Sequence, residues 1–91
     1  MEVSAATRAL SALGNERRLA IFRLLVSAGP EGVAAGEIAR RLDIVQNTLS
    51  SSLSILSHAE LITSRRNGRS IFYSAASDRF SDLMDFLAAK G

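Results

Sequence analysis

Two groups of polar side chains in this sequence are candidates for contact with a polyanionic partner. The first is a run of short amide and hydroxyl side chains between residues 46 and 58, and the second is a set of three arginines around Asn67-Gly68. Amide side chains can make paired hydrogen bonds to adenine, and guanidinium groups bind phosphate through two parallel hydrogen bonds. The combination indicates contact with both the bases and the backbone of a nucleic acid.

The first group is predicted to lie on a helix from about Gln46 to His58. At about 100° per residue, Leu49, Leu53 and Leu56 fall within one sector and define the buried face of this helix. The polar side chains then occupy the first turn or the outer face. Those expected to contact base edges are Gln46, Asn47, Thr48, Ser50, Ser51 and Ser54. A shorter helix is expected just before it, and the three-residue turn between them predicts a helix-turn-helix whose second helix enters the major groove.

The three arginines are predicted to lie on a β-hairpin. Asn67-Gly68 favours a type I′ turn, because both central residues of that turn need a positive φ. In the resulting register Arg66 lies opposite Arg69, and two like charges at a hairpin tip favour a neighbouring anion such as phosphate. The residues expected to contact the phosphate backbone are Arg40, Arg41, Arg65, Arg66, Asn67 and Arg69. The opposing interpretation is a plain surface turn flanked by solvated arginines that discourage aggregation.

The two strands of this hairpin are expected to direct different side chains toward the core and toward solvent. The register pairs Ile62 with Tyr73 and Arg65 with Ser70. Since side chains alternate along a strand, Ile62, Ile71 and Tyr73 share the face directed toward the core, and Arg65 lies on the opposite face.

The remaining helices complete a mainly α-helical chain with one small hairpin, an α+β arrangement. Apolar side chains at helical spacing predict helices over 3–13, over 35–42 and from residue 77 or 78 onward. Asn15 is expected to cap one more helix. The buried face of that helix is expected to comprise Leu19, Phe22, Leu25 and Val26.

Composition excludes several classes of protein. The 91 residues contain no cysteine and one histidine, which excludes disulfides and thiolate metal sites and leaves too few nitrogen ligands for zinc. No apolar run approaches the roughly 20 residues needed to cross a bilayer, and without a signal peptide a cytoplasmic location is expected. With no paired carboxylates, Ser-His-Asp set or glycine-rich phosphate loop, neither an enzyme nor a cofactor is expected. A single tyrosine and no tryptophan offer little base stacking, which favours duplex DNA over single strands.

The small net charge of +2 is distributed unevenly along the chain. Residues 40–73 carry five arginines and two acids, whereas residues 74–91 carry two bases and three acids. A basic middle and an acidic end indicate one face for phosphate and another face for a different contact. No repeat or linker interrupts the pattern, so residues 1–91 are interpreted as one domain.

Six short runs of sequence, taken in order, carry a further signal. They are LGNERRLAI at 13–21, EIA at 37–39, QNTLS at 46–50, LSIL at 53–56, AELI at 59–62 and GRSIFY at 68–73. Together they resemble the ArsR/SmtB family of bacterial transcriptional repressors over nearly the whole chain. The resemblance implies a winged helix-turn-helix that binds a pseudo-palindromic operator in duplex DNA as a homodimer, with the first and last helices at the dimer interface. The interface residues expected on this basis are Val3, Leu10, Leu13, Phe80, Leu83, Met84 and Leu87.

The chain departs from that family at the positions that sense metal ions. Ala34 and Gly36 stand where related metal sensors carry a Cys-x-Cys pair, and the last helix carries aspartates without histidine. No metal is therefore expected, and the identity of any small-molecule or protein effector is left open. Val45 stands where the family usually has a helix-capping serine or threonine, and Ser51 stands where a basic residue is common.

A second interpretation is a winged-helix module that binds proteins and no longer binds DNA. It is favoured by the predicted recognition helix, in which His58 is the only cationic side chain. At the end of that helix, His58 is expected to complement the helix dipole rather than to bind a ligand. Binding of duplex DNA separates the two interpretations.

Overall fold

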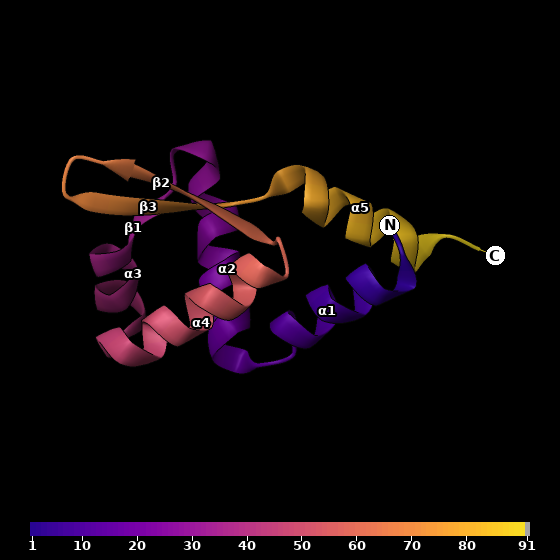
Figure 1. Cartoon of the computed structure of the whole chain (residues 1–91), viewed down its shortest axis with the longest axis horizontal. Helices are drawn as coiled ribbons and strands as arrows, with labels where there is room; N and C mark the ends of the chain where they lie inside the picture. The colour runs from indigo at the N-terminus through magenta and orange to yellow at the C-terminus, as the bar shows by residue number, and fades with distance from the viewer. Residues whose placement is uncertain (91) are drawn as a thin grey trace.

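The computed structural model describes residues 1–90, which form five α-helices, a 3₁₀ helix and three strands (Figure 1). In order these are α1 (Val3–Leu13), α2 (Glu16–Ala28), η1 (Gly29–Glu31), β1 (Val33–Ala34), α3 (Ala35–Leu42), α4 (Gln46–His58), β2 (Ile62–Asn67), β3 (Ser70–Ala75) and α5 (Ser77–Ala88). The strands form one antiparallel sheet in the order β1-β3-β2. The predicted class, mainly helical with the element order of a winged helix-turn-helix, is confirmed.

Local signals place the helix boundaries where the sequence predicts them. The side-chain oxygen of Asn15 accepts a hydrogen bond from the backbone N–H of Arg18 at 3.0 Å, so Asn15 caps α2 as expected. Helix α4 spans Gln46–His58. Its three inner residues, Leu49, Leu53 and Leu56, are at most 4% exposed.

The predicted buried face of α2 is partly wrong. Phe22 and Leu25 are buried as expected, but Leu19 is 43% exposed and Val26 is 46% exposed, while Ile21 is fully buried. Leu19 lies about 120° and Val26 about 100° around the helix from Leu25. The helix is turned away from the predicted orientation because it packs against α1, α3, α4 and β3 at once, which the spacing of its own side chains does not encode.

The predicted register of the hairpin is also wrong. Asn67 pairs with Ser70 and Arg66 pairs with Ile71, so the two-residue loop is Gly68-Arg69 rather than Asn67-Gly68. Gly68 has a φ of 65° and Arg69 has no positive φ, which fits a turn with glycine at its first central position. Arg66 and Arg69 therefore do not lie opposite each other.

The prediction of which residues share a face survives this change, because the register moved by two residues and side chains alternate with a period of two. Ile62 is buried and Tyr73 is half-buried on the core side. Ile71 shares their face but is 38% exposed, and it lies near the hairpin tip, where it pairs with Arg66. Arg65 lies on the opposite face, paired with Phe72.

Strand β1 is an addition that the sequence did not predict. Val33 and Ala34 pair with Tyr73 and Phe72 of β3 and turn the hairpin into a three-stranded sheet. Gly32 makes the approach possible: its φ is 78°, and a Cβ at this position would lie 2.6 Å from the backbone oxygen of Tyr73. Only glycine fits this position without displacing β3.

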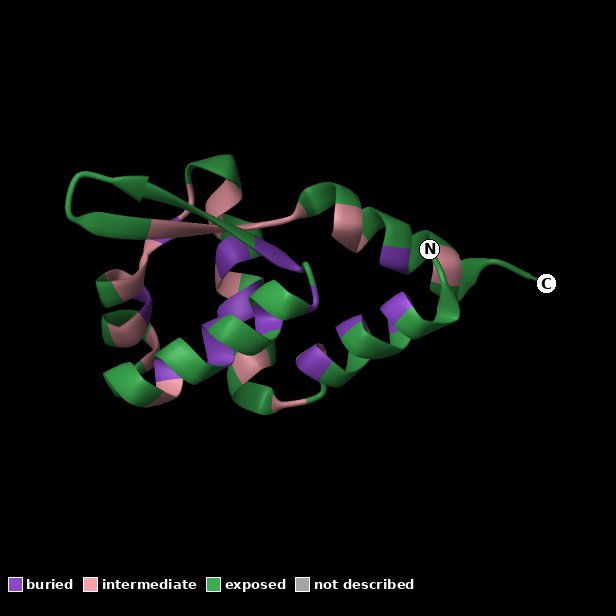
Figure 2. Cartoon of the chain, in the orientation of Figure 1, coloured by how far each residue is buried: buried purple, intermediate pink, exposed green. Residues whose placement is uncertain are grey.

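The molecule is elongated, with principal extents of 45 × 23 × 19 Å. The hairpin tip, α3 and the start of α4 lie at one end, and the chain termini with α1 and α5 lie at the other (Figure 1). Every α-helix turns buried side chains toward a shared core, while the distal part of the hairpin is exposed (Figure 2). No helix within residues 1–90 is both long and apolar enough to cross a membrane.

Candidate nucleic-acid interface

The outer face of α4 presents the predicted base-contacting side chains to solvent. Five of the six predicted residues are exposed and Thr48 is half-buried; the exposed ones are Gln46, Asn47, Ser50, Ser51 and Ser54. The amide nitrogen of Gln46 donates to the hydroxyl of Ser50 at 3.5 Å, a long bond that a stronger partner can replace. The helix therefore offers short donors and acceptors without a charged side chain in its first turn.

The first turn of α4 has no side-chain cap. Val45 occupies the N-cap position in an extended conformation and makes no capping hydrogen bond. Asp43 does not substitute for it, because Asp43 ends α3 in the left-handed conformation with a φ of 52°. Backbone N–H groups at this end of α4 thus lack an intrahelical or side-chain acceptor, a state that suits contact with an anion.

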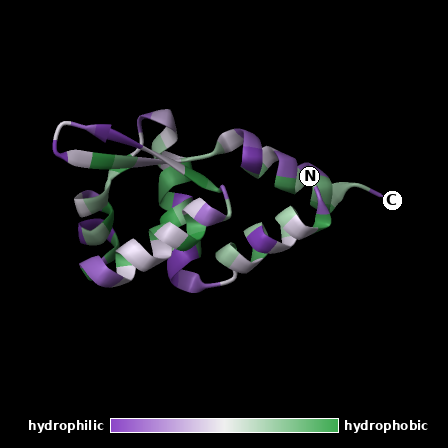
Figure 3. Ribbon diagram, viewed as in Figure 1, coloured by the Kyte–Doolittle hydropathy of each residue, from purple (hydrophilic) through white to green (hydrophobic). Residues whose placement is uncertain are grey.

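The start of α4 and the tip of the hairpin line one hollow. It has a volume of about 290 Å³ and is bounded by Gln46 of α4, Arg69 and Ser70 of the hairpin, and Ala35 and Gly36 at the start of α3. Residues far apart in the sequence therefore present an amide and a guanidinium to the same space. The hairpin tip and the outer part of β2 form the hydrophilic edge of this end of the molecule (Figure 3).

The two arginines of α3 share one carboxylate. Arg40 donates from Nε to Oε1 of Glu37 at 3.1 Å, and Arg41 donates from Nε to Oε2 of Glu37 at 2.8 Å. The hydrogen bonds from Arg40 and then Arg41 lower the pKa of Glu37 to about 2. Glu37 is not among the functional residues predicted from the sequence, although its spacing of three and four residues from the arginines is the signal of such pairs on a helix.

The three arginines of the hairpin differ in their surroundings. The guanidinium of Arg65 donates from Nη2 to the backbone oxygen of Glu31 at 2.6 Å and lies 5.1 Å from the centre of the Phe72 ring. Arg66 and Arg69 are exposed, and neither forms an ion pair with any residue in 1–90. Two guanidinium groups at the hairpin tip are therefore available to an anion.

His58 is held by its own helix. Its Nδ1 lies 2.8 Å from the backbone oxygen of Ser54 and 3.3 Å from the hydroxyl of Ser54. Across residues 1–90, no three histidine, cysteine, aspartate or glutamate side chains gather where they could hold a metal ion.

The terminal helices carry an exposed apolar surface at the other end of the molecule. Val3 is 70% exposed, Leu10 43%, Met84 41% and Leu87 50%, whereas small alanines fill the inner side of α1. Leu13 and Phe80 are half-buried. Leu83 is fully buried within the protomer, so its predicted place on the interface surface is corrected to the layer beneath that surface.

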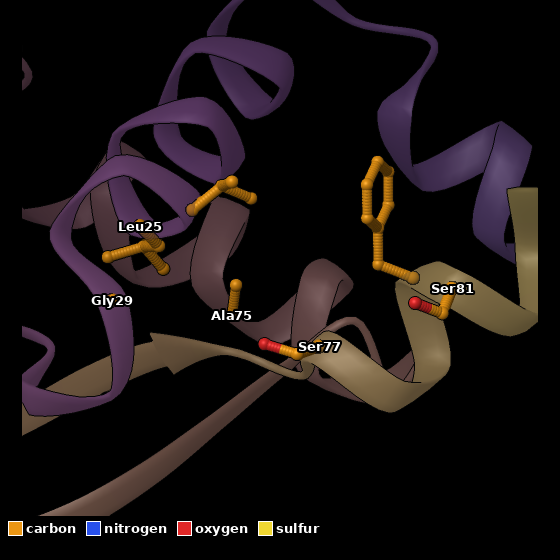
Figure 4. Close-up of a pocket in the computed structure, with 7 residues that line it drawn as sticks. Leu25, Gly29, Ala75, Ser77 and Ser81 are labelled. Carbon is orange, nitrogen blue, oxygen red and sulfur yellow. The ribbon is translucent and has the colours of Figure 1, made fainter.

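A seam between α2 and α5 adds apolar surface that the sequence did not predict. One hollow of about 140 Å³ lies between Leu25 and Gly29 on the α2 side and Ser77 and Ser81 on α5 (Figure 4). A second hollow of about 360 Å³ is lined by Leu19, Val26 and Phe80 among others, and Phe80 packs on Phe22 with ring centres 5.4 Å apart.

Comparison with known proteins agrees with the helix-turn-helix arrangement of this chain. The helix-turn-helix domain family matches residues 13–65. The nodulation protein NolR of Rhizobium meliloti is 35% identical over 79 residues, which cover 87% of this chain and 62% of NolR, so the chain spans less than two thirds of that relative. The transcriptional activator HlyU of Vibrio cholerae is 31% identical over 78 residues, which cover 86% of this chain and 69% of HlyU.

A solved structure agrees in fold over most of the chain. It is the homodimeric winged helix-turn-helix DNA-binding domain of a possible ArsR-family transcriptional regulator from Mycobacterium bovis. The TM-score is 0.79 at 29% sequence identity, and the match covers 93% of this chain and 76% of the other chain.

Proposed function

Because the chain belongs to the ArsR/SmtB family of winged helix-turn-helix transcriptional regulators, we propose that it binds a pseudo-palindromic operator in duplex DNA as a homodimer. The observation that carries this proposal is the hollow shared by Gln46 and Arg69. A helix able to probe base edges and a hairpin able to hold phosphate face the same space, as a major-groove complex with a flanking wing requires.

The proposed contacts divide between bases and backbone. Base edges are assigned to the exposed amides and hydroxyls of α4, with Thr48 at the margin; these residues are Gln46, Asn47, Thr48, Ser50, Ser51 and Ser54. Phosphates are assigned to the two wing arginines without an ion pair, to Asn67 between them and to the α3 pair; these residues are Arg40, Arg41, Arg66, Asn67 and Arg69. Arg65, which the sequence also predicts to contact phosphate, already donates a hydrogen bond to the backbone oxygen of Glu31. The uncapped first turn of α4 supplies further donors for phosphate.

The second half of the proposal is a homodimer through α1 and α5. Support comes from Val3, Leu10, Met84 and Leu87, which expose apolar surface on two adjacent helices, and from the homodimeric M. bovis domain. A protein of this size buries a modest share of its own surface, so covering this patch would add stability. Two-fold symmetry would present one recognition helix to each half of the operator.

The proposed location is the cytoplasm, where the chromosome of a bacterial cell lies. An operator that overlaps a promoter would make the protein a repressor. No catalytic role is proposed for any residue.

The test is a salt-titrated binding assay on a fluorescent duplex selected from a random-sequence library. Wild type is expected to bind the selected duplex with an affinity that falls steeply between about 50 and 200 mM salt. Arg66→Ala and Arg69→Ala should each weaken binding and make the salt slope shallower by about 0.9 for each phosphate that is no longer neutralised. Arg17→Ala, at an exposed residue in the first turn of α2, is the matched control and should bind like wild type.

Two results would contradict the proposal. If wild type binds no duplex above the level of the double Arg66→Ala, Arg69→Ala variant, the alternative of a protein-binding winged helix takes its place. If sedimentation shows only monomer at micromolar concentration, the dimeric half of the proposal fails.

A further inference from the structure

Arg65 joins the hairpin to a distant part of the chain. Its Nη2 donates to the backbone oxygen of Glu31 at 2.6 Å, across 34 residues of sequence. Glu31 is the last residue of η1, the short turn that follows α2. A second bond reaches the same turn from the neighbouring strand, where the hydroxyl of Ser74 donates to the backbone oxygen of Pro30 at 3.2 Å.

The point to which Arg65 is attached is itself fixed. Pro30 restricts its own φ, and the next turn passes through Gly32, whose backbone lies so close to β3 that no Cβ can be added. The turn therefore provides a rigid acceptor, and a bond to it restricts the angle between the hairpin and the helical body.

The other side of the Arg65 guanidinium is also occupied. Phe72 lies directly across the ladder from Arg65, and its ring centre is 5.1 Å from the guanidinium carbon. A planar guanidinium can lie against an aromatic ring and donate in its own plane at the same time, whereas an ammonium group cannot satisfy both geometries. The site thus suits arginine for its shape as well as for its charge.

We propose that Arg65 is a positioning residue that fixes the wing against the turn after α2, and that phosphate contact by the wing belongs to Arg66 and Arg69. One N–H of Arg65 is engaged by Glu31 and one face of its guanidinium is covered by Phe72, whereas the guanidinium groups of Arg66 and Arg69 form no ion pair within the described chain. The consequence for DNA affinity rests on the proposed function, but the consequence for wing mobility does not.

The first experiment is therefore made without DNA. Amide ¹⁵N relaxation and hydrogen exchange are measured across residues 65–72 in wild type, Arg65→Lys, Arg65→Ala, Arg66→Lys and Arg66→Ala. Both Arg65 variants should make the hairpin amides more mobile, and both Arg66 variants should leave them unchanged. Ser74→Ala, an uncharged change at the second tie, should act in the same direction as the Arg65 variants. Unchanged hairpin mobility in Arg65→Ala overturns the proposal.

The second experiment measures duplex binding by the same proteins. Removal of a positioning hydrogen bond should weaken binding roughly five- to tenfold in Arg65→Ala, and Arg65→Lys should fail to restore it although it keeps the charge. Arg66→Lys should restore most of the affinity that Arg66→Ala removes, because a point charge still serves at a phosphate. Wild-type affinity in Arg65→Lys would instead identify Arg65 as a phosphate contact.

The two experiments also separate this inference from the proposed function. If wild type binds no duplex, the proposed function fails, and the mobility of the hairpin alone decides the role of Arg65. Thermal unfolding monitored by circular dichroism provides the folding control, and these surface replacements should unfold within a few degrees of wild type.

Discussion

Replacement of Glu37 by glutamine tests how much positive charge on α3 is available to DNA. Glu37 accepts hydrogen bonds from both Arg40 and Arg41, at 3.1 and 2.8 Å, so the three groups present one net positive charge where the arginines alone would present two. Because the bonds hold the pKa of Glu37 at about 2, this carboxylate stays ionised throughout the physiological range. Glu37→Gln should therefore free one further cation per protomer at any pH where the protein works.

Counterion release gives the size of the expected effect. Each further phosphate neutralised steepens the plot of log affinity against log salt by about 0.9. A homodimer would neutralise two further phosphates, so its slope should steepen by about 1.8, and the fall in affinity between about 50 and 200 mM salt should grow by about twelvefold. The advantage over wild type should be largest at low salt and shrink as salt is added.

Fluorescence anisotropy of a labelled duplex, titrated at several salt concentrations, measures this slope. Glu16→Gln is the matched control, because it removes an exposed carboxylate of the same kind from the start of α2 and raises the net charge equally. A steeper slope in Glu37→Gln but not in Glu16→Gln is expected. Identical slopes in the two variants would refute the idea that α3 arginines reach phosphate, since only total charge would then matter.

Three further predictions concern titration, packing and assembly. When both arginine partners of Glu37 are replaced by glutamine, an NMR titration should show the pKa of Glu37 moving from about 2 toward 4.5. In wild type, the stability contributed by this carboxylate is present above about pH 4.5 and is lost as the pH falls toward 2. A wild-type pKa near 4.5 would contradict the hydrogen-bonded arrangement. Gly32→Ala should lower the free energy of unfolding by about 1–3 kcal/mol more than Gly68→Ala does, because both residues have a positive φ but only Gly32 is crowded by its neighbours. Equal effects of the two replacements in denaturant unfolding would argue against the close approach of β3 to Gly32. Leu83→Ala removes a fully buried side chain and should lower the free energy of unfolding by about 2–5 kcal/mol. Leu87→Ala changes a side chain that is 50% exposed and should instead shift sedimentation toward monomer. The reverse pattern would place the dimer contact elsewhere.

The parts of the fold that the sequence predicts well are those set by local chemistry. Asn15 caps α2 with a bond to a residue three positions on, and the leucines of α4 identify both the extent and the inner face of that helix. In each case the decisive interaction lies within one or two turns of chain. Sequence patterns carry that information directly.

The features that the sequence does not predict depend on contacts between distant residues. Asn67-Gly68 and Gly68-Arg69 both give Gly68 the positive φ that it needs, so turn chemistry alone does not select between two registers that bury the same strand faces. Strand β1 is two residues long and exists only because β3 lies beside it. The bond between Arg65 and Glu31 likewise depends on the angle between hairpin and body, which no local pattern specifies.

The candidate interface has few cationic side chains that are free of an ion pair, which limits the electrostatic part of its affinity for DNA. Arg66 and Arg69 have no ion pair among residues 1–90, the α3 group adds at most one net charge, and Arg65 already has partners. Two to three available cations per protomer give a dimer a salt slope of about −3.6 to −5.4, which corresponds to a fall in affinity of roughly 150- to 2,000-fold between about 50 and 200 mM salt.

With a salt slope of this size, much of the discrimination between DNA sequences must come from uncharged groups. Base contacts from the amides and hydroxyls of α4 would then have to supply the preference for one operator over other DNA, because contacts to phosphate carry no sequence information. Adding Arg65 as a phosphate contact would steepen the slope of the dimer by about 1.8, which moves the expected range to about −5.4 to −7.2. A slope that becomes shallower by about 1.8 in Arg65→Ala would therefore show that Arg65 reaches phosphate, whereas an unchanged slope in Arg65→Ala is what a positioning role requires.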